Sequence, residues 1–403
     1  MTDVSRRCVF YLSGFDPKGA SHYHALYRDE SARQGSAEGG TRTVGLRRRQ
    51  ASGNAFWNIE ARCGDRVVDT HYEFMRWDDV VRKHWPKSTA ALWWDVIATT
   101  VFYLRTGTWW KMLRLSLPPA IAVFTPFLLV CALLLGTPLA ALGGGWLVAS
   151  RLEHVGLGIG AGALLAAALW WAGRRIEARY SMYWMMRSYA FTARQGRGEV
   201  PDLEQRLDEL AQCLVDRVHM HGDDEVLVVG HSSGAIMAAS VVARALRIDP
   251  ALLRGHTTLS LLTLGQWIPL LGLLPMAQGL RDELQLLGAC HGLTWTDFSA
   301  PPDGCCFALT DPLTGCGVAP APAHGAAIKL LNPRFAALFD APAYAALKRD
   351  KFLLHFQYLR ATDKPGDYDY FAITSGPLTL AQRFAHLPSV VDFRGFWPLA
   401  KAR

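Results

Sequence analysis

One serine in this sequence lies in a pattern that exposes a hydroxyl for nucleophilic attack. Ser232 stands between Gly230 and Gly234 in a G-x-S-x-G pattern, at the end of the segment Glu225–Gly234. The apolar start of this segment is typical of a buried strand, and the following Ala235–Ile248 is compatible with a helix. Strand, tight turn and helix in this order form a nucleophile elbow, a strained turn whose flanking residues must be small. An ordinary turn capped by Ser232 would explain the serine but not both glycines.

A histidine further along the chain could activate this serine. A serine hydroxyl is a weak nucleophile until a base takes its proton, and that base is usually a histidine held by a buried carboxylate. We select His355, which lies between apolar residues in Phe352–Tyr358, a segment that we interpret as a β-like run. His324 and His386 are the alternatives, whereas His231 lies inside the elbow and is expected to point away from the nucleophile as a packing residue. The non-catalytic interpretation of His355 is a hydrogen-bonded histidine of the core.

The carboxylate that would hold this base is expected after a strand. Asp303 follows the expected strand Gly292–Phe298 through a Pro-Pro turn, which is typical of a catalytic loop at a strand end. Asp297 lies inside the strand, and Asp311 precedes a proline that favours a simple turn. We therefore select Asp303, with a solvent-exposed turn aspartate as its non-catalytic interpretation.

These segments together resemble the α/β-hydrolase superfamily. The resemblance covers Cys8–Leu12 with its following loop, Glu225–Ile248 and the later strands. That superfamily orders its triad as serine, acid and histidine along the chain, which here gives Ser232, Asp303 and His355. Tyr358 follows His355 by three positions, and this pattern is similar to hydrolases in which an aromatic residue follows the histidine three residues later. The resemblance implies a mainly parallel sheet with helices on both faces.

The resemblance further implies an oxyanion hole made by two backbone N–H groups. One donor is expected from Ser233, directly after the nucleophile, and the other from Phe15, in the loop after the first strand. Ser13 departs from the pattern, because many superfamily members carry histidine at this position. His22 and His24 follow shortly. They either line the pocket or open a helix, and a two-histidine metal site is a third interpretation.

The coarse pattern of elements indicates an α/β fold. Apolar, β-rich segments alternate with helix-compatible segments, which implies a mainly parallel sheet. A helix after Trp77 is expected to have an aspartate N-cap. The expected strands are Cys8–Leu12, Thr41–Arg49, Ala55–Ala61, Val67–Met75, Glu225–Val229, Thr257–Leu264 and Gly292–Phe298, the third and fourth forming a hairpin. The expected helices are Tyr23–Gln34, Ala91–Leu113, Arg174–Phe191, Val200–Gly222, Ala235–Ile248 and Ala277–Leu287.

Two long apolar runs predict a membrane hairpin. No charged residue occurs in Leu115–Ser150, and a second uncharged run covers Val155–Gly173. A membrane-spanning helix needs about 20 apolar residues. We therefore predict transmembrane helices at about 118–142, with kinks at its prolines, and at about 154–173, with a tight turn at Gly143–Gly145. The alternative is a pair of buried helices in a soluble core.

The residues around the two runs favour the membrane interpretation. Aromatic side chains suit the membrane interface, and cations favour the cytoplasmic side. The loop within the hairpin carries only one cation, so both flanking parts are expected in the cytoplasm, at a bacterial inner membrane. The aromatic residues are Trp93, Trp94, Trp109 and Trp110 before the runs, and Trp170, Trp171, Tyr183 and Trp184 at or after their end. The cations are Arg105, Lys111 and Arg114 before the runs, Arg151 between them, and Arg174, Arg175 and Arg179 after them.

Composition sets the remaining limits. The chain has 403 residues, 50% of them hydrophobic, and a formal net charge of +7. No compact basic helix or stacking motif indicates nucleic-acid binding. The eight cysteines show no metal-type spacing and fit reduced thiols of the cytosol, although a Cys305–Cys316 bond stays open. We expect neither a metal nor a cofactor.

The sequence thus predicts a membrane-anchored serine hydrolase. Its hydrolase domain would comprise residues 1–90 and 192–403, with a membrane-associated helical insertion at 91–191. The substrate would be a lipid or an acyl-chain ester or thioester, cleaved by a Ser-His-Asp triad. An acyltransferase with the same acyl-enzyme chemistry is one alternative, and a non-catalytic membrane scaffold is the other.

Overall fold

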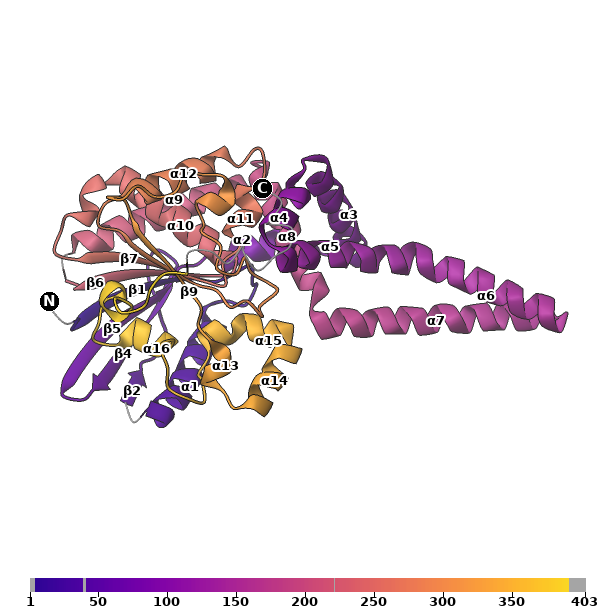
Figure 1. Cartoon of the computed structure of the whole chain (residues 1–403), viewed down its shortest axis with the longest axis horizontal. Helices are drawn as coiled ribbons and strands as arrows, with labels where there is room; N and C mark the ends of the chain where they lie inside the picture. Colours follow the sequence, from indigo (N-terminus) through magenta and orange to yellow (C-terminus); the bar gives the residue numbers. More distant parts are fainter. Residues whose placement is uncertain (1–3, 39–40, 221, 391–403) are drawn as a thin grey trace.

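One mixed sheet organises the part of the chain that carries Ser232. The computed structural model describes residues 4–38, 41–220 and 222–390. Within them nine strands form one sheet in the order β2-β4-β5-β1-β6-β7-β8-β9, with β3 paired to β4 (Figure 1). The strands are β1 (Arg6–Leu12), β2 (Thr41–Val44), β3 (Arg48–Arg49), β4 (Ala55–Cys63), β5 (Arg66–Phe74), β6 (Glu225–His231), β7 (Thr258–Leu264), β8 (Thr294–Phe298) and β9 (Ala327–Leu331).

The pairing of the strands follows from their burial. β6 is buried along its whole length, and β1 and β7 are buried at every residue but the first, as expected for parallel strands covered on both faces. β4 instead alternates buried and exposed residues and pairs antiparallel with β2, β3 and β5 at one edge. β1 pairs in parallel with both β5 and β6, so the sheet joins residues before and after the apolar runs. An α/β fold with a mainly parallel sheet is confirmed.

Helices cover both faces of this sheet. α9, α10 and α12 lie on one face, and α1, α13 and α16 lie on the other (Figure 1). Each face has its own apolar core, with leucines of α9 in one and tyrosines of α1 in the other. The helices of the globular part are α1 (Ala20–Glu38), α2 (Asp78–Lys83), α9 (Pro201–His219), α10 (Gly234–Ile248), α11 (Ile268–Gly272), α12 (Gln278–Ala289), α13 (Phe335–Leu338), α14 (Ala341–Arg349), α15 (Lys351–Phe356), α16 (Tyr370–Ser375), α17 (Leu380–Arg383), and the short η2 (Pro250–Leu253), η3 (Thr314–Cys316) and η4 (Gln357–Leu359).

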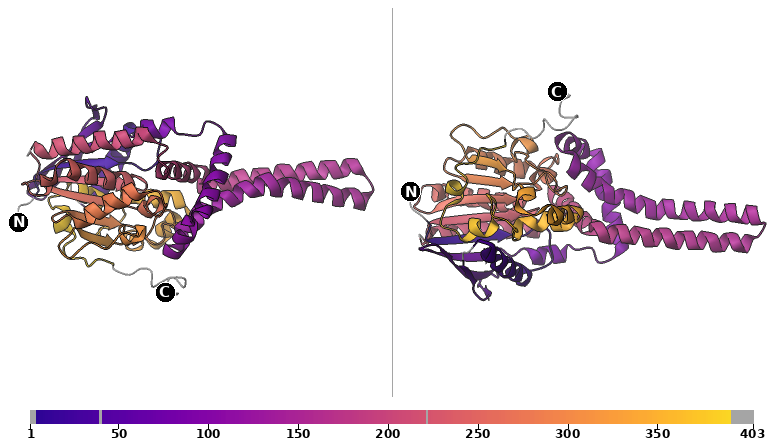
Figure 2. Two further views of the ribbon diagram at one scale, coloured as in Figure 1. Left: turned by 90° about the horizontal axis from the view of Figure 1, so that it is seen from above. Right: turned by 60° about the horizontal axis from the view of Figure 1, so that its bottom comes forward.

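A helical segment inserted between β5 and β6 projects from this globular part. α6 and α7 run antiparallel and lie side by side in each view (Figure 2). α5, η1 and α6 form one continuous helix of 36 residues, and α7 has 26 residues. Both are long and apolar enough to cross a membrane. The segment consists of α3 (Thr89–Arg105), α4 (Thr108–Leu115), α5 (Leu117–Cys131), η1 (Ala132–Gly136), α6 (Thr137–Leu152), α7 (Val155–Tyr180) and α8 (Met182–Gly196).

The predicted glycine turn is wrong. Gly143–Gly145 lies inside α6, and the chain reverses at Glu153, which has a φ of 52°. The glycines instead allow the two helices to touch, because a Cβ on Gly145 would lie 2.8 Å from the carbonyl oxygen of Gly158. A Cβ on Gly162 would lie 2.7 Å from the carbonyl oxygen of Ala141. The first apolar helix is therefore longer than predicted.

Three further local predictions differ from the structure. The N-cap of α2 is Trp77 and not an aspartate, so Asp78 and Asp79 form the first helical turn. The segment 91–113 divides into α3 and α4 at Gly107, whose φ of 69° ends a helix without steric cost. The segment 174–191 divides at Ser181, which has a φ of 49°. This last break turns α8 away from the direction of α7.

Candidate active site

Ser232 lies at a strained turn between β6 and α10. Its φ of 59° is in the left-handed region, which is uncommon for a residue other than glycine. The Ser232 N–H donates to the carbonyl oxygen of Leu264 on the neighbouring β7, at 2.9 Å. The hydrogen bond and the flanking elements hold the turn in this conformation. Strain of this kind is concentrated at functional sites.

The two flanking glycines are required by close backbone contacts. A Cβ on Gly230 would lie 2.5 Å from the carbonyl oxygen of Gly234. A Cβ on Gly234 would lie 2.5 Å from the carbonyl oxygen of Ser13 and would also meet that of Leu12. These neighbours are backbone atoms, which cannot rotate away. The geometry therefore explains both glycines, which a simple helix cap at Ser232 would not need.

Asp303 and His355 form a buried pair. His355 Nδ1–H donates to Asp303 Oδ2 at 2.8 Å, although the two residues are 52 positions apart. Asp303 lies in the loop after β8, and Tyr358 O–H also donates to its Oδ2, at 3.1 Å. The Cys305 N–H donates to the other carboxylate oxygen at 2.9 Å. Burial disfavours the charged carboxylate, but His355 and these donors outweigh it and lower the pKa of Asp303 below its ordinary value.

The prediction that His355 ends a β-like run is wrong. His355 lies in the six-residue helix α15, whose N-cap is Asp350. The apolar neighbours in its segment pack in a short helix rather than along a strand. The helix still follows β9 in the chain and presents the imidazole to the carboxylate of the loop after β8.

The alternative acids and bases have other partners. Asp297 accepts from Thr263 Oγ1 at 2.7 Å and from Ser299 Oγ at 2.8 Å. Asp311 accepts from two backbone N–H groups of its own turn. His386 is exposed and lies 3.5 Å from Asp367, and His324 is also exposed. None of these four alternatives lines the cavity that holds both Ser232 and His355.

One of the two expected oxyanion donors is engaged. The Phe15 N–H donates to Ser233 Oγ at 2.8 Å, so the Ser233 side chain occupies the donor that we expected to be free. The Ser233 N–H has no acceptor among the residues that the structure describes. Gly14 brings this loop onto the elbow, because a Cβ there would lie 3.1 Å from Ser232 Cβ. A substrate oxygen would bind both N–H groups only after the Ser233 hydroxyl rotates.

His231 has a larger part in the site than the sequence indicated. We expected it to point away from the nucleophile as a packing residue, but it lines the same cavity as Ser232 and His355. Its Nε2–H donates to the carbonyl oxygen of His355 at 2.8 Å, and the two rings are 5.0 Å apart. Burial, followed by the charge of His355, lowers the pKa of His231 to about 3. His231 therefore stays neutral and fixes the backbone of the predicted base.

Because His231 is neutral in the folded protein, we predict that the free energy of unfolding depends on pH. The ordinary pKa of histidine is about 6.5, so below this pH the unfolded chain binds a proton that folded His231 does not. The stability that this site contributes is fully present above about pH 6.5 and is lost as the pH falls toward 3. The slope approaches about 1.4 kcal/mol per pH unit in this window.

The measurement is unfolding of the detergent-solubilised protein at a series of pH values in this window. His231→Gln keeps a donor for the His355 carbonyl but does not titrate, so its stability should fall less steeply with acid. Equal slopes for the two proteins would show that His231 is protonated in the folded state.

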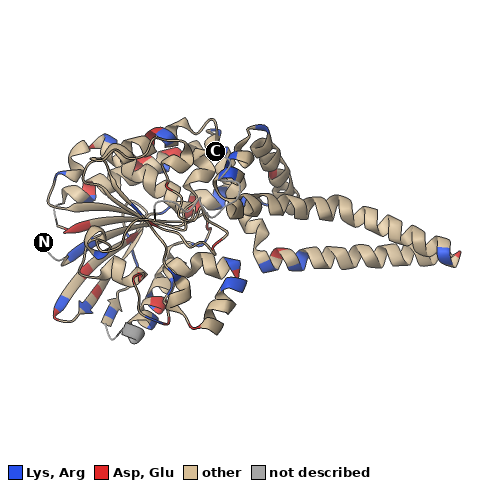
Figure 3. Cartoon of the chain, in the orientation of Figure 1, with Lys and Arg blue, Asp and Glu red and all other residues tan. Residues whose placement is uncertain are grey.

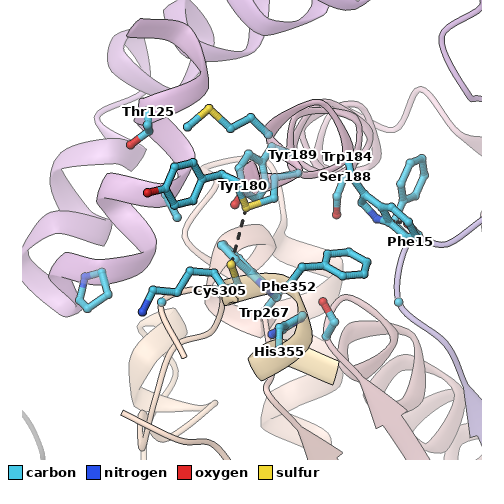
Figure 4. A pocket seen from close by; sticks show the side chains of 18 of the residues that line it. Phe15, Thr125, Tyr180, Trp184, Ser188, Tyr189, Trp267, Cys305, Phe352 and His355 are labelled. Carbon is cyan, nitrogen blue, oxygen red and sulfur yellow. Dashed lines mark hydrogen bonds between the residues drawn. The ribbon is translucent and has the colours of Figure 1, made fainter. Parts of the chain in front are cut away.

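A largely apolar cavity of about 540 Å³ adjoins these residues. Trp184, Ser188 and Tyr189 of α8 lie on one side of it, and His355 and Phe352 of α15 lie on the other (Figure 4). Its volume is in the range typical of sites for small ligands. Because residues of α5 and α8 line the cavity, the inserted helices form part of its wall.

Ser232 and His355 share this cavity but make no hydrogen bond to each other among the described residues. Bonds of this kind are often long before substrate binds. His22 and His24 lie in the first turns of α1 and do not line the cavity, and His24 Nε2 lies 2.8 Å from the carbonyl oxygen of Gly45. The described residues include no group of three or more His, Cys, Asp or Glu that could hold a metal. All eight cysteines are free thiols, so no Cys305–Cys316 bond exists in this structure.

Comparison of the chain with protein families, curated proteins and solved structures found no match.

Proposed function

We propose that this protein is a membrane-anchored serine hydrolase of the α/β-hydrolase type, which cleaves an ester or thioester of an acyl-chain or lipid substrate. The observation that carries the proposal is the buried Asp303–His355 pair beside the strained Ser232, all at the same end of one sheet. The order of these residues along the chain also agrees with the superfamily. A hydrolase-like scaffold without catalysis would need neither a strained serine nor a buried aspartate–histidine pair.

The proposed chemistry has two steps. His355 Nε2 takes the proton of Ser232 as Ser232 Oγ attacks the acyl carbon, and Asp303 stabilises the imidazolium that forms. The Ser233 and Phe15 N–H groups stabilise the oxyanion. The bond to the leaving alcohol or thiol breaks, His355 gives it the proton, and the acyl group stays on Ser232. His355 then takes a proton from water as the water oxygen attacks the acyl carbon. The bond from that carbon to Ser232 Oγ breaks, His355 returns the proton to Ser232, and the acid is released.

The same proposal places the hairpin of α6 and α7 in a bilayer. Leu139 and Leu164 are 70% and 74% exposed, and both belong to a large apolar surface that water would not favour. At about 1.5 Å per residue, α7 is about 39 Å long, enough for a hydrocarbon core of about 30 Å. The cations at the base of the hairpin favour a cytoplasmic globular part (Figure 3).

Covalent labelling tests the nucleophile. A fluorophosphonate probe is expected to label the detergent-solubilised wild-type protein at Ser232 and to leave Ser232→Ala unlabelled, because only an activated serine hydroxyl displaces the leaving group of the probe. Ser52→Ala, which changes an exposed turn serine, is the matched control and should label like the wild type. Full labelling of Ser232→Ala, with the modified peptide elsewhere, would remove Ser232 from the proposed mechanism.

A further inference from the structure

The mouth of the cavity lies at the base of the helical hairpin. Among the residues that line the cavity, three have exposed side chains, namely Ile121, Tyr180 and Lys351. Ile121 is 52% exposed near the start of the 36-residue helix, and Tyr180 is 45% exposed at the last residue of α7. Residues that are both exposed and part of the lining mark where a cavity opens. The opening is therefore between the two helices that could cross a membrane and the start of α15.

The wall behind this mouth suits an acyl chain. The lining from the hairpin base inward is apolar, with Leu117 and Ala122 of α5 and Met182 and Met185 of α8. Cys305 Sγ lies 3.6 Å from Met185 Sδ, next to the loop residue that holds His355 (Figure 4). An apolar path thus connects the hairpin base to the surroundings of Ser232. A chain that left the bilayer at this mouth would remain in apolar contact along its length.

The mouth also carries positive charge. The Lys351 ammonium forms no ion pair with any residue that the structure describes. Arg179, one residue before Tyr180, donates to the carbonyl oxygen of Arg349 at 2.7 Å and fixes the end of α7 against α14. The nearest acid in the sequence, Asp350, accepts from the Leu353 N–H at 2.9 Å and lies 3.7 Å from Arg179. The charge of Lys351 is thus not cancelled by its neighbour.

Among the described residues that line the cavity, one carries a carboxylate, and this carboxylate has its own donors. Asp16 accepts from Tyr23 O–H at 2.9 Å and from the Lys18 N–H at 2.8 Å. Its side chain is almost completely buried, and burial raises its pKa. It follows Phe15 in the loop at the elbow, whereas Lys351 is exposed at the mouth. An anion at the mouth would therefore meet Lys351 rather than a free carboxylate.

We propose that the substrate is an anionic lipid of the adjoining leaflet, which enters between Ile121 and Tyr180 with its head-group charge at Lys351 and its acyl ester toward Ser232. The inference rests on the proposed function of Ser232 and specifies the substrate class. A lysine at the level of the interface attracts anionic head groups. A soluble acyl thioester would reach the same apolar wall only past the hairpin helices, so the position of the mouth favours a bilayer lipid.

Photo-cross-linking tests this access route without catalysis. Ser232→Ala protein is reconstituted in phosphatidylcholine vesicles that contain a little phosphatidylglycerol with a photoreactive acyl chain. Cross-links are expected on residues of the cavity wall such as Met185. Unlabelled phosphatidylglycerol should compete for them, and added phosphatidylcholine or a soluble acyl thioester should compete weakly. Lys351→Gln, added to the Ser232→Ala protein, should lower the yield of cross-linked phosphatidylglycerol about fivefold, as expected for the loss of one cation at a lipid surface.

Two further variants sharpen the test. Lys348→Gln removes a cation that lies over the Tyr344 ring and does not line the cavity, so its capture should equal that of the parent protein. Ile121→Trp should obstruct the mouth and reduce cross-links to Met185. Equal competition by the two phospholipids, or full capture by Lys351→Gln, would overturn the anionic-lipid proposal. Capture at Met185 without any Ser232-dependent turnover in the catalytic protein would instead overturn the hydrolase and leave the lipid site standing.

Discussion

Replacing His355 by alanine is expected to lower kcat for an acyl ester by about 10⁴- to 10⁶-fold, nearly as much as replacing Ser232. The reason is that both groups act in one event, in which the imidazole takes the proton while the hydroxyl attacks. Asp303→Asn should cost about 10⁴-fold, because an amide no longer stabilises the imidazolium or favours the required tautomer. A variant that combines these changes should lose little more than the worst single variant. The measurement is steady-state turnover of a soluble short-chain ester.

His386→Ala is the matched control for this series. His386 is an exposed histidine that lies 3.5 Å from Asp367, outside the cavity, so its loss should change kcat by no more than about twofold. If the fold losses of kcat in the Asp303 and His355 variants multiply in the combined variant, the two residues do not act on Ser232 as a unit. A near wild-type His355→Ala would exclude it as the base, whatever its contact with Asp303.

The elbow could be predicted because each of its parts is encoded locally. The apolar run predicts the strand, and the helix-compatible residues after it predict α10. Gly230 and Gly234 are explained by contacts within the turn and with the neighbouring β1, which a Cβ would violate. The pairing of Asp303 with His355 could be proposed from chain order after β8, although their 2.8 Å contact spans 52 residues. Their catalytic roles remain predictions.

Other features depend on contacts that a single sequence does not display. Glycines in an apolar run suit a turn, but they also suit two helices in backbone contact, and Gly145 takes the second role against Gly158. The segment around His355 is short, and the spacing of its apolar residues does not distinguish a strand from a helix. The structure has the six-residue helix α15 there. His231 is predicted to pack because it lies inside the elbow, and a sequence does not display its hydrogen bond to the carbonyl oxygen of His355, 124 residues away. The signal that could have identified it is its position beside the nucleophile.

A shortened hairpin is expected to separate catalysis from membrane attachment. Gly173 and Leu133 already meet across the two helices, so residues 134–172 can be replaced by a short Gly-Ser linker between them. α5 and α8 then remain to line the cavity. The wild-type protein should resist extraction by high salt and by alkali, whereas the shortened variant should be released by alkali. The shortened variant should keep its turnover of soluble short esters. Its turnover of lipid in vesicles should fall about 10²-fold, because the hairpin no longer holds the mouth of the cavity at the bilayer.

The orientation of the intact protein completes this test. Tags at Met1 and Arg403 should both report the cytoplasm, because the cations at the hairpin base favour that side and Arg151 is the only Lys or Arg between the runs. A cysteine at Ser150, near the exposed end of α6, should react with an impermeant thiol reagent added on the non-cytoplasmic side of the membrane. A cysteine at the exposed Ser52 of the globular part is the matched control and should stay protected until the membrane is permeabilised. Release of the intact wild-type protein by salt alone would contradict the anchor, because two apolar helices in a bilayer do not dissociate when charges are screened.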